Sequence, residues 1–98
     1  MKIVRQHHTT RIGAKQKLDR EFDGLMKRFG DKATDINRQW KGDTLAFSLR
    51  TYGFDISGTL QVTSADLELD VKLPLIARAF EGRIESAVDQ WVADTYGK

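Results

Sequence analysis

The 98-residue sequence predicts an α+β fold, an antiparallel β-sheet with two covering helices in the order β-α-β-β-β-β-α. Two observations carry this prediction. Apolar residues recur every three or four positions in segments 11–30 and 76–91, and they alternate with polar residues between 34 and 73. The length suits a single domain, residues 1–98. A chain of this size holds a modest core without disulfides, and it contains no cysteine.

A short strand and a helix are predicted at the start of the chain. Residues 2–7 form the strand, with Ile3 and Val4 as its apolar content. Thr9 or Thr10 supplies the N-cap hydroxyl of the helix that follows. We expect Gly30 to end that helix. Its apolar face consists of Ala14, Leu18, Phe22, Leu25, Met26 and Phe29.

Four further strands are predicted at 34–40, 44–50, 53–62 and 66–73. The segment KGD at 41–43 makes a tight turn between the first two of these. Alternation of leucine and valine with charged residues in the last strand is typical of an antiparallel sheet with one buried face. Gly58 interrupts the apolar phase of its strand, which indicates either a bulge or the close approach of another backbone or side chain.

The closing segment predicts two parts that divide near Gly82. Pro74 suits the start of a helix. From Ile84 to Trp91 the apolar stripe is narrow and the opposite face is acidic, which predicts a helix packed on the sheet. Residues 75–80 are apolar on more than one side. We therefore expect an exposed apolar lip, the candidate surface for a ligand or another body, formed by Leu75, Ile76 and Phe80 with Arg78 beside them.

The net charge of +2 conceals an asymmetry between the two halves of the chain. Residues 1–50 hold 12 Lys and Arg against 6 Asp and Glu, a balance of +6. Residues 51–98 hold 4 against 8, a balance of −4. The first half could steer an anionic partner, or the two halves could attract each other. We favour the second interpretation, which needs no partner.

No constellation of residues predicts catalysis, a cofactor or a metal. Neighbouring strand residues point to opposite faces, so His7 and His8 are not expected to share a metal. Asp66, Glu68 and Asp70 share a strand face and could bind a hard cation, but a solvated face explains them more simply. The sequence has no nucleophile-elbow, phosphate-loop or zinc-protease motif. We therefore expect a protein that is not an enzyme and name no catalytic residue.

Nucleic-acid binding through the basic first helix is a third and less favoured alternative function, and no transmembrane segment is expected. The predicted first helix is basic, but Asp19, Glu21 and Asp23 interrupt its field, and no aromatic stacking platform is present in the strands. No apolar run approaches the ~20 residues that cross a bilayer. The N-terminal residues lack the apolar region of a secretory signal. These features predict a cytoplasmic protein.

Two motifs resemble those of a known bacterial family. The segment from Trp40 to Ser48 reads W-x-G-D-x-L-x-F-S, and the ending carries Leu73-Pro74, Phe80, Gly82, Ile84 and Glu85. In order and spacing, nearly the whole chain resembles the polyhydroxyalkanoic acid system proteins, also called polyhydroxyalkanoate granule-region proteins. The stretch from Tyr52 to Gly58 is longer and more aromatic than the family form. The family is associated with polyhydroxyalkanoate, a storage polyester held in cytoplasmic granules, and has no established catalytic residues.

The resemblance implies a non-enzymatic accessory protein that binds the granule surface, granule-associated proteins or a hydrophobic acyl ligand. The predicted element order is also similar to a reduced helix-grip fold, as in lipid-binding START-type domains. That likeness gives an alternative, a small hydrophobic-ligand pocket of roughly a few hundred Å³ between the sheet and the last helix. An exposed sheet edge would also make a homo-oligomer possible. The pocket would be lined by Phe47, Phe54, Leu69 and Trp91.

Overall fold

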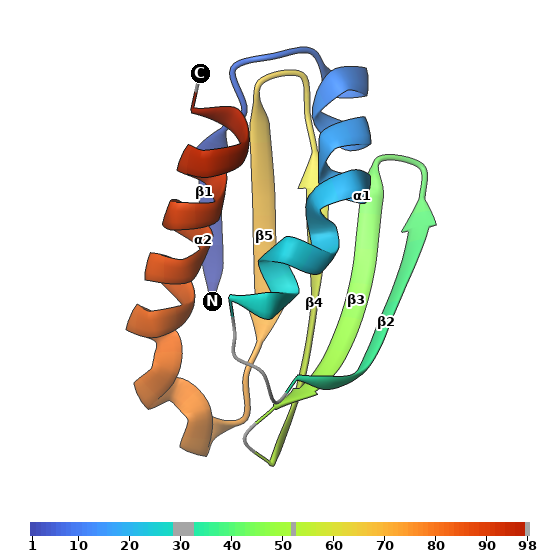
Figure 1. The fold of residues 1–98 in the computed structure, drawn as a ribbon. Coiled ribbons are helices and arrows are strands. Elements are labelled where there is room, and N and C mark those ends of the chain that lie inside the picture. The colour runs from blue at the N-terminus through green and yellow to red at the C-terminus, as the bar shows by residue number, and fades with distance from the viewer. Residues whose placement is uncertain (29–32, 52, 98) are drawn as a thin grey trace.

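The computed structural model describes residues 1–28, 33–51 and 53–97, which form an antiparallel sheet with both helices on one face (Figure 1). The five strands lie in the order β1-β5-β4-β3-β2, so the first strand pairs with the last. The predicted α+β class and element order are confirmed. The elements are β1 (Lys2–Gln6), α1 (Arg11–Lys27), β2 (Thr34–Lys41), β3 (Thr44–Thr51), β4 (Phe54–Val62), β5 (Asp66–Lys72), the 3₁₀-helix η1 (Leu75–Phe80) and α2 (Glu81–Tyr96).

The core lies between the sheet and the two helices, as the alternation of apolar residues predicts. Leu45 and Leu49 of β3 and Leu67 and Leu69 of β5 are buried on the helix side of the sheet. Two predicted residues of the first helix, Phe29 and Gly30, lie outside the described residues. The helix side chains that complete the core are Ala14, Leu18, Phe22, Leu25 and Met26 of α1 and Ile84, Val88, Trp91 and Tyr96 of α2.

Gly58 lies where an aromatic ring crosses the sheet. It pairs with Phe47 across β3 and β4, and the register of both neighbouring ladders continues through it without a shift. A Cβ atom built at Gly58 would lie 3.0 Å from Cζ of Phe47 and would overlap the carbonyl oxygen of Asp70. Close approach, rather than a bulge, therefore explains this glycine. The irregularity of the sheet lies in β2 instead, between Thr34 and Asn37.

A buried histidine ties the start of α1 to the turn between β4 and β5. The backbone N–H of Thr9 donates to Nδ1 of His7 (3.2 Å), so Nδ1 is the acceptor nitrogen of the ring. Nε2 then carries the hydrogen and donates to the carbonyl of Thr63 (2.9 Å). The helix itself begins after Thr10, whose hydroxyl accepts from the N–H of Gly13 (3.0 Å). His8 is exposed, so the two histidines serve no common site.

Ion pairs join the basic first half of the chain to its acidic second half. Arg5 of β1 contacts Asp89 of α2 (2.6 Å) and Glu85 one turn earlier (3.3 Å). Arg28, at the end of α1, contacts Asp94 near the end of α2 (2.6 Å). The favoured interpretation of the charge asymmetry, attraction between the halves, agrees with these pairs. They hold α2 against both β1 and α1.

Candidate functional site

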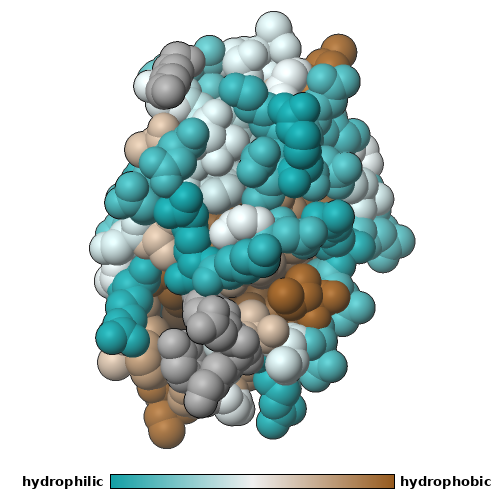
Figure 2. Space-filling view, viewed as in Figure 1, coloured by the Kyte–Doolittle hydropathy of each residue, from teal (hydrophilic) through white to brown (hydrophobic). Residues whose placement is uncertain are grey.

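The candidate site lies at the end of the molecule where η1 leaves the sheet. Leu75 and Ile76 are 79% and 77% exposed and are the most exposed large apolar side chains of the described chain. A 3₁₀-helix has three residues per turn, so one row of side chains faces inward while the other two face outward. Ala77 is on the inward row and is buried. The geometry of η1 therefore presents Leu75 and Ile76 to solvent. Figure 2 shows hydrophobic atoms gathered at this lower end of the molecule.

Arg78 accompanies the two apolar side chains on the exposed side of η1. Three residues separate it from Leu75, which places the two on one outward row. Its guanidinium lies 3.6 Å from the carboxylate of Glu81, the first residue of α2. The predicted division near Gly82 falls two residues earlier, between Phe80 and Glu81, where the 3₁₀-helix becomes an α-helix.

Phe80 does not stand out in solvent with Leu75 and Ile76. It is partly buried, and its ring centroid lies 6.1 Å from that of Phe54 with an interplanar angle of 56°. Phe54 was predicted to line an interior pocket and Phe80 to form the lip. The structure brings these two residues together, so the predicted lip continues inward as an aromatic pair.

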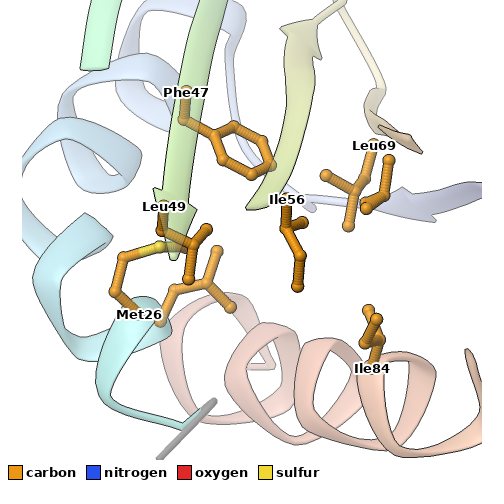
Figure 3. Close-up of a pocket in the computed structure, with 8 residues that line it drawn as sticks. Met26, Phe47, Leu49, Ile56, Leu69 and Ile84 are labelled. Carbon is orange, nitrogen blue, oxygen red and sulfur yellow. The ribbon is translucent and has the colours of Figure 1, made fainter. Parts of the chain in front are cut away.

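An apolar cavity lies between the sheet, α1 and α2 (Figure 3). Its water-accessible volume is about 10 Å³, room for roughly one water molecule. Two predicted pocket residues, Phe47 and Leu69, line it. The full lining is Leu25, Met26, Phe47, Leu49, Ile56, Leu69, Val71 and Ile84, all apolar.

Trp91 belongs to a second small cavity, also of about 10 Å³, which Leu69 lines as well. Its indole Nε1 donates to the carbonyl of Glu21 (3.3 Å), and its ring meets Tyr96 edge-on at 5.6 Å. Neither cavity approaches the few hundred Å³ of the predicted ligand pocket. Trp91 in this arrangement locks α2 to α1.

Thr51, at the end of β3, is a buried polar residue that the sequence pattern did not single out. It is 5% exposed, and its hydroxyl has no hydrogen-bond partner among the described residues. It pairs with Phe54, two steps along the ladder from the pair of Leu49 with Ile56, both of which line the cavity. The available signal was its position, because threonine occurs where the alternation of Leu45, Phe47 and Leu49 calls for an apolar residue.

Tyr96 is the described group whose titration is most strongly altered by the fold. Its hydroxyl donates to the carbonyl of Ala14 (2.9 Å) in a buried position. Burial raises the pKa of Tyr96 well above its ordinary value, and the charge of Glu21 adds to the increase. The hydrogen bond of Asp89 raises the pKa of Arg5 in the same direction. Tyr96 is therefore kept as a neutral hydrogen-bond donor, and Arg5 is held in its charged form beside Asp89.

The W-x-G-D segment of the sequence anchors the β2–β3 hairpin on α1. Trp40 donates from Nε1 to the carboxylate of Asp19 (3.0 Å). The ammonium of Lys15 lies 4.9 Å from the centroid of the Trp40 ring and donates to the carbonyl of Gly42 (2.6 Å). Gly42 adopts a φ of 60°, which favours glycine. Asp43 lies 3.9 Å from the same ammonium. This motif therefore explains packing and offers no reactive group.

The described chain offers neither a metal cluster nor a membrane-spanning helix. Within residues 1–28, 33–51 and 53–97, no three metal-ligating side chains gather in one place. The same residues contain no helix with the length and hydropathy needed to cross a bilayer. The three carboxylates of β5 include Glu68, which lies 3.8 Å from Lys2.

Comparison with known proteins gave one kind of match. A family model described as "Putative polyhydroxyalkanoic acid system protein" matches residues 1–95. Searches of curated proteins and of solved structures found no significant match. The matched segment contains the five strands, α1, η1 and all of α2 except its last residue, Tyr96, and it contains every residue of the lip and of the two small cavities.

Proposed function

Since the chain belongs to the polyhydroxyalkanoic acid system protein family, we propose that it is a non-enzymatic accessory protein that contacts the granule surface. The contact is made by the lip, defined as Leu75, Ile76, Arg78 and Phe80. The observation that carries the proposal is the exposure of Leu75 and Ile76 side by side on a helical turn that has its own buried anchor in Ala77. A polyester granule is a cytoplasmic body with an uncharged, largely apolar surface on which these side chains can be buried.

The size of the lip sets the strength of the contact. Burying one leucine or isoleucine side chain contributes about 1.5–3 kcal/mol, so two contribute roughly 3–6 kcal/mol before the cost of association. Without that cost, the range would correspond to a dissociation constant between about 6 mM and about 40 μM, so a single molecule binds more weakly than this. We therefore infer reversible attachment of single copies, strengthened when many copies or a partner protein share one granule.

The charges around the lip favour an uncharged surface over an anionic membrane. Arg78 is already engaged with Glu81, and the exposed side of α2 carries Glu85 and Asp89, which share the single cation Arg5 of β1. An interfacial helix that binds anionic lipid carries Lys or Arg on its polar face instead. A polyester has no charge to repel these carboxylates.

Binding of a small hydrophobic ligand is the second candidate function. The observation in its favour is the cavity between the sheet, α1 and α2, which is lined only by apolar side chains. Its volume of about 10 Å³ is too small for an acyl chain unless side chains move. Such a lining offers no acid, base or nucleophile, which supports a binding role rather than catalysis.

Co-sedimentation with protein-free polyhydroxyalkanoate particles tests the proposal. We expect the wild type to sediment with the particles and the double variant Leu75→Ser, Ile76→Ser to lose at least tenfold in binding. Ile12→Ser is the matched control, because Ile12 is also apolar and exposed (67%) but lies in the first turn of α1. Failure of the wild type to bind, or equal binding by the double variant, would overturn the polyester contact. Binding only to native granules that carry their proteins would do the same and would indicate a protein partner.

A further inference from the structure

An open groove of about 250 Å³ lies between α1 and α2. It is separate from the lip, and it shares Trp91 with one of the two small cavities. Its volume is below the roughly 300–1,000 Å³ of sites for drug-sized ligands, so it suits a smaller molecule. The lining consists of Lys17, Arg20, Glu21 and Gly24 of α1, Arg28 at the end of that helix, and Trp91, Asp94 and Thr95 of α2.

Gly24 leaves a hollow in the α1 wall of the groove that packing does not require. Glycine inside a helix lowers the stability of the helix relative to alanine. A Cβ atom built at Gly24 would meet no atom of the described residues within 4 Å, so no close approach demands a glycine here. The space that a larger side chain would fill therefore belongs to the groove. A ligand that occupies this space explains the glycine.

The charged side chains that line the groove sum to +1. They comprise three cations, Lys17, Arg20 and Arg28, and two carboxylates, Glu21 and Asp94. Arg28 and Asp94 lie 2.6 Å apart and offset each other. Two cations and one carboxylate remain within about one turn of α1. This balance favours a ligand with a single negative charge.

Lys17 and Arg20 can both bind an anion. The ammonium of Lys17 donates to the carbonyl of Thr95 (3.3 Å) and lies 5.7 Å from the centroid of the Tyr96 ring. Within the described chain it has no ion pair, and an ammonium has three hydrogens to donate. Nε of Arg20 lies 3.9 Å from the carboxylate of Glu21, and the Arg20 side chain is 69% exposed. Such a pair contributes little and leaves the guanidinium able to bind a ligand.

We propose that this groove binds a small hydroxycarboxylate. Its carboxylate contacts Lys17 and Arg20, its hydroxyl donates to Glu21, and its hydrocarbon part lies over Gly24. Ionised Glu21 accepts hydrogen bonds but donates none, so an anion bound beside it needs a donor group of its own. An ammonium in place of the hydroxyl would give a ligand without net charge, which complements the groove less well.

The site is argued from the groove alone and does not depend on the granule contact. Hydroxycarboxylates are also the units from which a polyhydroxyalkanoate is built, so the setting of the family provides this class of ligand. The lip and the groove then give the protein separate contacts for the polymer and for its monomer.

Three small probes test the proposal on the full chain. 3-Hydroxybutyrate carries both groups, butyrate lacks the hydroxyl, and methyl 3-hydroxybutyrate lacks the negative charge. Amide chemical shifts in ¹H–¹⁵N NMR spectra measure the binding of each. We expect 3-hydroxybutyrate to bind with a dissociation constant of about millimolar, butyrate about 3- to 10-fold more weakly, and the methyl ester at least about tenfold more weakly. Equal binding of the acid and either of the other probes, or no binding of the acid, would overturn the proposal.

Gly24→Gln tests the hollow, because glutamine fills it without adding charge and is a good helix former. We expect this variant to bind 3-hydroxybutyrate at least about fivefold more weakly while its midpoint of urea unfolding rises. Gly82→Gln is the matched control. A Cβ at Gly82 would also meet nothing within 4 Å, but Gly82 lies in the first turn of α2, outside the groove lining. Unchanged binding by folded Gly24→Gln, or equal weakening by Gly82→Gln, would refute the site.

Lys17→Gln tests the cationic wall and should weaken the binding of 3-hydroxybutyrate about 3- to 10-fold. Lys27→Gln removes the same charge from the exposed last turn of α1, outside the groove lining, and should change binding by less than about twofold. Urea unfolding shows whether each variant is folded. Equal weakening by the two variants would indicate a general effect of charge and would contradict the site, and Gly24→Gln decides the matter if Lys17→Gln fails to fold.

The groove and the granule contact can fail separately. The Leu75→Ser, Ile76→Ser variant should lose particle binding and bind 3-hydroxybutyrate as the wild type does. Gly24→Gln should keep particle binding and lose affinity for 3-hydroxybutyrate. Loss of 3-hydroxybutyrate binding in the lip variant would place the ligand at the lip and overturn the groove site.

Discussion

The rings of Phe54 and Phe80 pack at a centroid distance of 6.1 Å and join the start of β4 to the end of η1. This contact gives Phe80 two roles, at the rim of the lip and in the packing of the fold. Leu75 and Ile76 have no comparable structural role, because most of each side chain is exposed. Surface binding and stability can therefore be separated by the choice of residue.

Phe80→Ala is expected to lower the free energy of unfolding by about 1–3 kcal/mol, less than for a fully buried phenylalanine because Phe80 is partly buried. Leu75→Ser is expected to change it by no more than about 0.5 kcal/mol. Urea denaturation followed by tryptophan fluorescence measures both. Equal losses would show that η1 is packed more tightly along its outward rows than its exposure indicates.

Gly58→Ala and Gly24→Ala are expected to have effects of opposite sign. A Cβ at Gly58 meets the Phe47 ring and the backbone of β5, so overpacking should cost about 1–3 kcal/mol. A Cβ at Gly24 of α1 meets nothing within 4 Å, so alanine should raise stability by about 1 kcal/mol through helix propensity. The midpoint of urea unfolding decides each case. Tolerance of alanine at Gly58 would contradict the close approach of Phe47.

His7→Ala and His8→Ala test the buried imidazole. Loss of the His7 ring leaves a cavity and removes hydrogen bonds to Thr9 and Thr63, so we expect a loss of about 2–4 kcal/mol. His8 is exposed, and its replacement should stay within about 0.5 kcal/mol. Thermal unfolding of the two variants gives the comparison. Similar melting temperatures would contradict the structural role of His7.

Because its hydroxyl is buried, Tyr96 is expected to lower the free energy of unfolding at high pH. The pKa of Tyr96 is raised in the folded state, so folding favours the neutral phenol. The stability that this shift contributes is fully present below the unfolded pKa of about 10. Above that pH the unfolded state releases the proton more easily, and stability falls as pH rises. Tyr96→Phe should lose about 1 kcal/mol at neutral pH, because the bond to Ala14 is gone, but should decline less above pH ~10. Parallel declines of variant and wild type would refute the assignment to Tyr96.

Arg5 and Asp89 test the attraction between the two halves of the chain. The pair has short geometry at 2.6 Å but is exposed, so a double-mutant cycle with Arg5→Gln and Asp89→Asn should give a coupling of about 0.2–1 kcal/mol. Added salt should reduce it. Arg50 and Asp55 form the control pair, at 3.6 Å and with Asp55 84% exposed, and should couple more weakly. A stronger coupling in the control pair would contradict this ranking.

Local patterns in the sequence predicted the elements well. The alternation of Leu67, Leu69 and Val71 predicted β5, and the spacing of Ala14, Leu18 and Phe22 predicted the buried face of α1. Both patterns arise from the geometry of a single element, 2 residues per strand repeat and 3.6 per helical turn. The candidate lip could be predicted for a similar reason, since Leu75 and Ile76 are adjacent apolar residues beside Pro74.

The contact between Phe54, a predicted pocket residue, and Phe80, a predicted lip residue, could not be predicted from such local patterns. Phe54 and Phe80 are separated by the whole of β4 and β5, and their contact depends on where η1 turns back over the sheet. The unpaired hydroxyl of Thr51 likewise depends on what surrounds it rather than on its own strand. The periodicity of apolar residues predicts neither the contact of Phe54 with Phe80 nor the surroundings of the Thr51 hydroxyl.

By itself, the sequence determined the α+β class, the element order, the buried faces and the resemblance to the polyhydroxyalkanoic acid system family, because each is carried by residues close together in the chain. Only the tertiary structure decided that β1 pairs with β5, that η1 is a 3₁₀-helix with Leu75 and Ile76 outward, and that the rings of Phe54 and Phe80 meet. These features follow from packing between distant segments, where the burial of each side chain depends on all the others.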